Sequence, residues 1–167
     1  MLEVGLLTED DRVELIGGEI VDMTPIGWRH MNCVNRLNSL LVPLVFGQGY
    51  VVSVQNPVRL GIRDEPEPDF ALLADEPRGD LPTPEDAPLV IEVSDSSLQY
   101  DREIKLPLYA GSGVLEVWVV DLQGQRIEVY TEPAPDGYRA MRVFAAGEQV
   151  YSQAVERLSL SVDEVLG

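Results

Sequence analysis

Two acidic residues of this chain stand in runs of otherwise apolar residues. Asp69 opens the run Phe70–Leu73, and Glu92 interrupts the run Leu89–Val93. Short apolar runs of this kind predict β-strands that are buried inside a sheet. A carboxylate on a buried strand needs a partner, because an unpaired charge in the interior is very costly. We therefore expect each of these acids to meet a partner in the folded protein.

A lysine follows at a spacing that is typical of a helix face. Lys105 lies four residues after Asp101 and four before Tyr109, so on a helix all three share one side. It is the only lysine among the 12 basic residues, the others being arginine. Arginine cannot lose its proton whereas lysine can shift its pKa, which indicates a task specific to lysine. The alternative is an exposed ion pair of Asp101 with Lys105, worth only a few tenths of a kcal/mol.

Two carboxylates and an amine are the groups that metal-dependent phosphodiester hydrolysis uses. Mg²⁺ takes one or two carboxylates, keeps several waters and accepts a substrate oxygen. Asp69 and Glu92 fit the role of metal ligands, and Lys105 fits the amine that orients or deprotonates the attacking water. These residues predict a Mg²⁺ site, with Mn²⁺ as an alternative ion.

The overall charge argues against a nucleic-acid partner. A net charge of −17 and a pI near 4.2 repel a phosphate backbone at long range. A nuclease of this composition must therefore depend on local patches, on dimerisation or on neutralisation by a metal.

Length and composition limit the remaining possibilities. The 167 residues fit one domain spanning 1–167, with the 45% hydrophobic and 25% charged content of a soluble globular protein. No apolar run reaches the roughly 18 residues of a membrane span, so we expect no membrane partner and a cytoplasmic location. Cys33 is the only cysteine, which excludes an intramolecular disulfide and a cysteine-based zinc site.

The N-terminal part of the chain predicts a hairpin and a helix. Gly17–Gly18 permits the positive φ of a two-residue turn, which makes residues 13–23 a β-hairpin. Apolar residues three and four apart predict a helix over Trp28–Phe46, which Pro43 should kink or end. The only histidine, His30, points inward at its first turn, where a structural role is favoured over a site role. The expected buried face of the helix is formed by Val34, Leu37, Leu41 and Leu44.

The rest of the chain is rich in strands around a second helix. Tyr50–Val54 and Pro57–Leu60 have strand character. Residues 94–97 offer N-caps for a helix over Leu98–Ala110, which Pro107 should distort. We expect an α/β (α+β) fold in which a mixed central β-sheet is flanked by two helices. Further strands are expected at Val114–Asp121, Gln125–Thr131 and Tyr138–Phe144, and a short last turn capped by Ser161.

Several of these segments together match a known pattern. They are Glu14–Leu15, Gly18–Glu19, Met23–Pro25, His30, Pro68–Asp69, Ile91–Val93, Asp101, Lys105, Tyr109 and Gly113–Asp121. On these residues, which cover nearly the whole chain, the sequence resembles the Uma-type family of restriction-endonuclease-like proteins. That family is a domain of unknown function within the PD-(D/E)XK nuclease superfamily. The resemblance implies a restriction-endonuclease-like αβ core with Mg²⁺ held by Asp69 and Glu92.

The sequence departs from the superfamily pattern at one position. The third motif position after Glu92 is Ser94 rather than lysine, and Lys105 is where we expect the migrated amine. Lys105 with Tyr109 also resembles the Gln-x-x-x-Tyr element of some nucleases of the superfamily. We expect Glu19, His30 and Tyr109 as supporting residues of the site.

The sequence therefore predicts a divalent-metal-dependent endonuclease acting on nucleic acid, DNA in the first place. A homodimer is expected, because the strands within 114–131 leave apolar edges. One alternative is a nuclease fold that binds or regulates without hydrolysis, which Ser94 and the acidic surface favour. Another is an acidic structural or interaction protein in which Glu92 only pairs with Lys105 or an arginine. An open cleft shared by Asp69, Glu92 and Lys105 favours the enzyme, and a sealed Glu92–Lys105 pair favours the structural protein.

Overall fold

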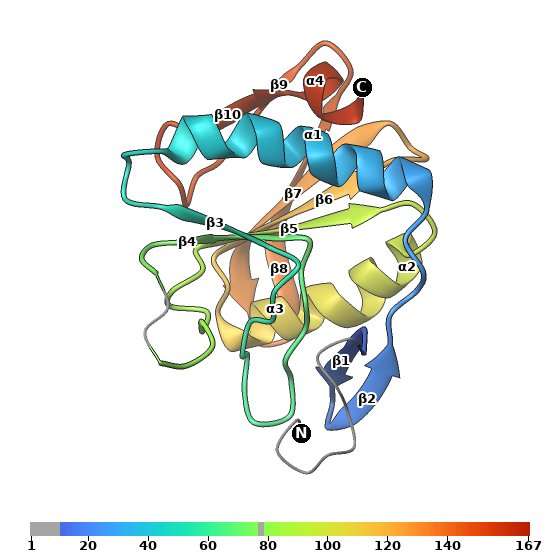
Figure 1. Cartoon of the computed structure of the whole chain (residues 1–167), viewed down its shortest axis with the longest axis vertical. Helices are drawn as coiled ribbons and strands as arrows, with labels where there is room; N and C mark the ends of the chain where they lie inside the picture. Colours follow the sequence, from blue (N-terminus) through green and yellow to red (C-terminus); the bar gives the residue numbers. More distant parts are fainter. Residues whose placement is uncertain (1–10, 77–78) are drawn as a thin grey trace.

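A six-stranded mixed sheet forms the centre of the molecule (Figure 1). The computed structural model describes residues 11–76 and 79–167. The sheet has the order β3-β4-β5-β6-β7-β8, in which β5 and β6 are parallel and the other neighbours antiparallel. The predicted mixed α+β architecture is thereby confirmed. The strands are β3 (Val51–Val54), β4 (Phe70–Leu73), β5 (Leu89–Ser94), β6 (Glu116–Asp121), β7 (Arg126–Ala134) and β8 (Gly137–Ala145).

Helix α1 (Trp28–Val45) covers one face of the sheet (Figure 1). It continues two residues beyond Pro43 and then ends, as the proline predicts. The expectation for Leu44 was wrong, since it is 40% exposed while Val45 is buried. Spacings of three and four residues from Leu41 are both compatible with an apolar face, so the pattern alone does not choose between the two. The buried residues of α1 are Cys33, Val34, Leu37, Leu41 and Val45.

The opposite face is covered by a helix that changes its winding. The segments α2 (Leu98–Tyr100), η2 (Asp101–Lys105) and α3 (Leu106–Ser112) follow one another directly, and η2 is a π-helical turn. In this turn the N–H of Leu106 donates to the carbonyl five residues earlier. Pro107 has no N–H to offer the next carbonyl, so the expected distortion is present as a π turn before the proline.

The hairpin at the start of the chain stands apart from the large sheet. Strands β1 (Val13–Ile16) and β2 (Glu19–Asp22) pair antiparallel, and Gly17 and Gly18 adopt φ of 60° and 82° at the turn, as predicted. The segment Pro57–Leu60, by contrast, is not a strand. Its N–H groups are used within a loop, because those of Val58 and Leu60 donate to the carbonyls of Pro66 and Asp64.

The C-terminal region adds a small second sheet. Strands β9 (Gln149–Tyr151) and β10 (Ser159–Ser161), which the sequence pattern did not predict, pair antiparallel. The short helix α4 (Val162–Leu166) follows, and the Ser161 hydroxyl accepts from the N–H of Glu164 as the expected cap. Within the parts of the chain that the structure describes, no helix has the length and apolar character needed to cross a membrane.

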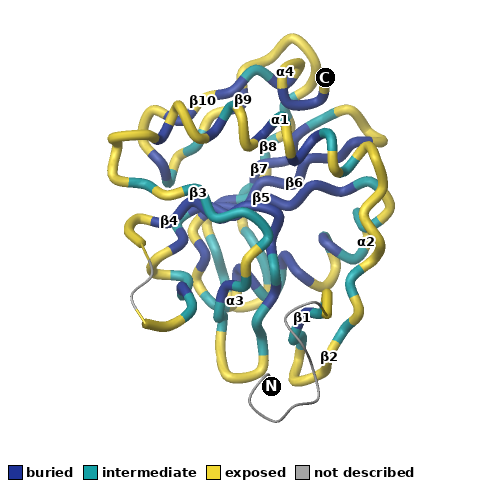
Figure 2. Tube along the Cα trace, viewed as in Figure 1, coloured by how far each residue is buried: buried dark blue, intermediate teal, exposed yellow. Residues whose placement is uncertain are grey.

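Burial is greatest in the middle of the sheet, where every residue of β5 and β6 is buried (Figure 2). Separate apolar clusters pack between the sheet and α1 and between the sheet and α3. This two-sided cover explains the continuous apolar run around Glu92. The expectation of free edges within residues 114–131 was wrong, because β6 and β7 both have neighbours on each side. The edges of the sheet are β3 and β8.

Candidate active site

Glu92 of β5 meets two side chains of the helix that crosses its face. The Lys105 ammonium lies 2.6 Å from Glu92 Oε1, and the Tyr109 hydroxyl donates to the same oxygen at 2.6 Å. All three side chains are buried. The spacing of four residues thus brings Lys105 and Tyr109 to one side of the helix, as the sequence predicts, and gives the buried acid its partners.

A second carboxylate reaches Lys105 from the hairpin. Glu14 of β1 accepts from Lys105 Nζ at 2.8 Å and from the backbone N–H of Glu67 at 2.8 Å. Glu14 was not among the site residues predicted from the sequence, although it is, like Glu92, an acid inside an apolar run. The other hairpin acid, Glu19, is exposed and does not line the cavity described below. The structure therefore brings Glu14 into the cluster and leaves Glu19 outside it.

Asp69 is fixed at the start of β4 by groups from two other elements. Its Oδ2 accepts from the N–H of Val93 at 2.8 Å, and its Oδ1 lies 3.0 Å from His30 Nε2. Gln55 Nε2 donates to the same Oδ1 at 3.4 Å. His30 thus contacts a predicted ligand directly, which places it inside the candidate site, although a structural role was favoured from the sequence.

Ser94, the residue that departs from the superfamily pattern, forms a buried hydrogen bond with Asp101. The hydroxyls of Ser94 and Ser97 both donate to Asp101 Oδ2, at 2.6 and 2.8 Å. Asp101 opens the π-helical turn that carries Lys105. Ser94 therefore ties this turn to the end of β5, which helps to fix Lys105 next to Glu92.

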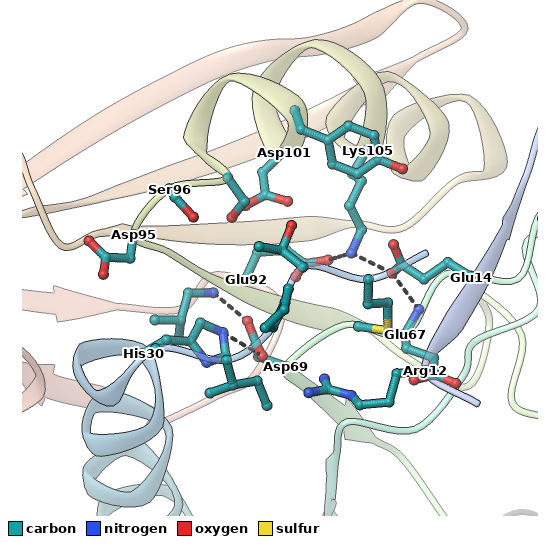
Figure 3. A pocket seen from close by; sticks show the side chains of 18 of the residues that line it. Arg12, Glu14, His30, Glu67, Asp69, Glu92, Asp95, Ser96, Asp101 and Lys105 are labelled. Carbon is teal, nitrogen blue, oxygen red and sulfur yellow. Dashed lines mark hydrogen bonds and ion pairs between the residues drawn. The ribbon is translucent and has the colours of Figure 1, made fainter. Parts of the chain in front are cut away.

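Most of these side chains line one cavity of about 400 Å³ (Figure 3). Tyr109 is not among its lining residues and contacts the site through Glu92. The Glu92–Lys105 pair is nearly sealed, with side chains 6% and 5% exposed. A shared cleft favours the enzyme, and a sealed Glu92–Lys105 pair favours the structural protein. The molecule has both features, because the pair is buried and also shares a cavity with Asp69. Its wall is rich in charged or ionisable side chains, which are Arg12, Glu14, Asp22, His30, Glu67, Asp69, Glu92, Asp95, Tyr100, Asp101 and Lys105.

Burial and neighbouring charges shift the ionisation of the cluster. Desolvation raises the pKa of Glu92, and the charge of Lys105 opposes that shift. For Lys105, desolvation would lower the pKa, but the charges of Glu92 and Glu14 outweigh it and raise the pKa. Lys105 is therefore an ammonium at neutral pH and can orient a water or balance charge rather than take a proton. Desolvation also acts on His30, yet the hydrogen bond and charge of Asp69 give it a raised pKa.

The cavity wall carries carboxylates, the ligand type that a hard divalent cation prefers. Glu14, Asp69, Glu92 and Asp101 are all buried on the cavity wall, where the buried ammonium of Lys105 faces them. Both neighbours of Glu92 use Oε1, so neither uses Oε2. Across residues 11–76 and 79–167, no cluster of three or more His, Cys, Asp or Glu forms a ready-made metal cage. Mg²⁺ does not need such a cage, because it completes its shell with waters and substrate oxygens.

Comparison with known proteins identifies the family and the fold of the chain. No curated protein matches the chain. A crystal structure described as "a putative nuclease belonging to DUF820", from Anabaena variabilis, superposes with a TM-score of 0.79 at 16% sequence identity. The alignment covers 98% of this chain and 94% of that one, so the two share a fold. The Uma2 family, described as "Putative restriction endonuclease", matches residues 2–163. The chain therefore belongs to the Uma2 family.

Proposed function

We propose that this protein is a divalent-metal-dependent endonuclease that hydrolyses phosphodiester bonds of nucleic acid, DNA in the first place. The observation that carries the proposal is the shared cavity of Asp69, Glu92 and Lys105. Membership of a family described as restriction endonucleases, and a fold shared with a protein described as a nuclease, both support nuclease-like chemistry.

In this proposal Asp69 and Glu92 hold Mg²⁺ or Mn²⁺. A bound ion of this kind polarises a phosphate oxygen and lowers the pKa of a coordinated water. The Lys105 ammonium orients the attacking water and balances the negative charge that develops on the phosphate. The other side chains fix these three: His30 orients Asp69, Tyr109 orients Glu92, and Glu14 holds Lys105 from the opposite side.

A cation held in the acidic cavity would also allow a strongly negative protein to act on a phosphodiester. The buried carboxylates on the cavity wall outnumber the ammonium that faces them. Without neutralisation they would repel a phosphate. Substrate binding at this cavity therefore depends on the cation, which ties affinity for nucleic acid to the metal.

A second candidate is a nuclease-fold module that binds without hydrolysis. The observation that favours it is Ser94, which stands at the motif position of the amine and is fully buried with its hydroxyl on Asp101. In this case Lys105 serves only to neutralise Glu92 and Glu14, and the cavity binds without turnover.

Calorimetric titration with Mg²⁺ and Mn²⁺ tests the metal site. We expect Asp69→Asn, which keeps the shape but removes the charge, to weaken binding at least about tenfold, the lower end of losses seen even for outer-shell partners. Glu19→Gln is the matched control, because it removes an exposed acid that does not line the cavity. Equal binding of the cation by wild type and by Asp69→Asn, with both proteins folded as judged by circular dichroism, would contradict the proposed metal site.

Cleavage is measured separately on plasmid and single-stranded substrates with Mg²⁺ or Mn²⁺. Metal-dependent nicking that Asp69→Asn abolishes supports the enzyme. Wild-type protein that binds the cation but cleaves neither substrate would favour the non-hydrolytic module.

A further inference from the structure

A second hollow, of about 650 Å³, opens at the beginning of α1. Its wall combines the first turns of α1, the turn between β6 and β7, and the last residues of the chain. Among the described residues that line it, two are arginines and none has an acidic side chain. In a chain with a net charge of −17, this composition contrasts with the acidic cavity of the candidate site.

The two hollows are neighbours. Gly27 and His30 line the acidic cavity, and Trp28 and Arg29, between them in the chain, line the second hollow. On the other wall Gln123 Nε2 donates to the carbonyl of Asp95 at 2.7 Å, and this contact also joins a residue of each hollow. A nucleic-acid strand with one phosphodiester in the acidic cavity would therefore reach the second hollow with a neighbouring part of its chain.

The surface there carries an exposed aromatic ring beside a cation. Trp28 is 69% exposed, whereas the other tryptophan, Trp118, is fully buried. The Arg29 guanidinium lies 5.6 Å from the centre of the Trp28 ring. Aromatic rings that stack on bases, together with arginines that contact the backbone, are how proteins hold single-stranded nucleic acid. This pair supplies the local patch that an acidic nuclease needs.

We propose that Trp28 and Arg29 form a subsite for one unpaired nucleotide next to the cleaved phosphodiester. The Trp28 indole stacks on the base and Arg29 contacts its phosphate. The inference rests on the proposed nuclease function and deepens it. It names single-stranded or locally unpaired nucleic acid as the substrate class, because both faces of a paired base are already stacked inside a duplex.

Tryptophan fluorescence tests the subsite without any need for cleavage. The protein is titrated in the presence of Ca²⁺ with a single-stranded oligonucleotide and, separately, with the same sequence as a blunt duplex. Because Trp118 is fully buried, a change in emission reports on Trp28. We expect the single strand to quench the emission, and the duplex to do so only at much higher concentration.

Affinity is then measured from the anisotropy of a fluorescein-labelled single strand. Trp28→Ala should weaken binding about tenfold, within the range for loss of one stacked base, while Trp28→Phe retains most of it. Phe46→Ala is the matched control, since Phe46 is 83% exposed just beyond the opposite end of α1. In Arg29→Ala, the slope of log affinity against log salt concentration should become smaller by about one, which is the value for one lost phosphate contact.

Each outcome decides the proposal. Unchanged affinity of Trp28→Ala, an equal loss in Phe46→Ala, or a duplex that binds as tightly as the single strand would overturn it. Loss of self-association in Trp28→Ala with unchanged affinity would also overturn it and assign Trp28 to a contact between copies of the chain. Trp28-dependent binding by a protein that cleaves nothing supports the subsite and contradicts the nuclease, so the two proposals fail separately.

Discussion

At the scale of single residues, the only lysine of the chain occupies a position made for a compact cation. Its Nζ lies 2.6 Å from an oxygen of Glu92 and 2.8 Å from one of Glu14, on two elements that approach from different sides. Arginine would carry the same charge on a larger planar group with several donors. A buried carboxylate left without its partner is strongly destabilising, so the amine has a structural task as well as the proposed chemical one.

Lys105→Arg separates these two tasks. We expect hydrolysis to fall about 100-fold or more, because the guanidinium cannot take the place of the compact amine beside the attacking water. We also expect a loss of about 1–3 kcal/mol in the free energy of unfolding, since a larger group must fit a packed site. Plasmid nicking and urea denaturation measure the two effects. Arg157→Lys, an exchange of the same two residue types at an exposed position, is the control.

The two measurements give different answers for the rival roles. A variant that loses stability but cleaves as fast as wild type, when assayed where both are fully folded, would exclude the amine from the chemistry and leave it as a counter-ion.

At the scale of elements, the π-helical turn η2 is anchored on both sides. Asp101 accepts from Ser94 at the end of β5, while Arg102, the next residue, forms an ion pair with Glu128 of β7. The Tyr130 hydroxyl also donates to Glu128, at 2.7 Å. Two successive residues thus hold the same turn to two strands of the sheet, and this limits the movement of Lys105.

The ion pair of Arg102 with Glu128 makes the stability of the folded protein depend on pH. Burial would raise the pKa of Glu128, but hydrogen bonds from Arg102 and Tyr130 outweigh it and lower the pKa below its ordinary value of 4.5. A lowered pKa in the folded state means that the stabilisation is present above the pKa of the unfolded chain. It is lost as the pH falls through the lower folded value.

Glu128→Gln should therefore destabilise the protein at about pH 7 and have a smaller effect at about pH 3. We expect a loss of about 1 kcal/mol at the higher pH, because the paired side chains of Arg102 and Arg126 are 34% and 40% exposed and solvent screens them. Urea denaturation at the two pH values measures it, with Glu132→Gln, an exposed acid of the same strand, as control. A loss that is the same at both pH values would contradict the assigned charge interaction.

Local patterns identified the elements that a few neighbouring residues determine. Gly17–Gly18 predicted the hairpin turn, and the apolar run around Glu92 predicted a central strand. Pro107 predicted a distortion, but only the hydrogen bond from the N–H of Leu106 to the carbonyl of Asp101 shows that it is a π turn. Glu14 and Lys105 lie 91 residues apart in the sequence, so no local sequence pattern predicts their contact.

At the scale of the whole molecule, β8 is one of the two edge strands of the large sheet. This strand pairs only with β7, and Met141 and Val143 on its outward side are 52% and 46% exposed. An edge strand with exposed apolar side chains is a natural contact for a second copy. We therefore propose β8, rather than the strands of residues 114–131, as the contact of the expected homodimer.

We predict that Met141→Lys converts a dimer into a monomer, since a charge on an edge strand opposes association. Sedimentation equilibrium at micromolar concentration measures the change. Ile62→Lys, at a loop residue that is 95% exposed, is the control and should leave association unchanged. Wild-type protein that sediments only as a monomer would remove the dimer from consideration.

The span of residues in the candidate site, from Glu14 to Tyr109, has a consequence for the protein during its own synthesis. A chain that has left the ribosome only as far as Asp95 carries Glu14, Asp69 and Glu92 but has no ammonium among them. The turn that brings Lys105 is fixed between β5 and β7, so residues up to Glu128 must be in place. Unfinished or truncated copies therefore lack the assembled site, so under the proposed function no cleavage of nucleic acid is expected before the fold is complete.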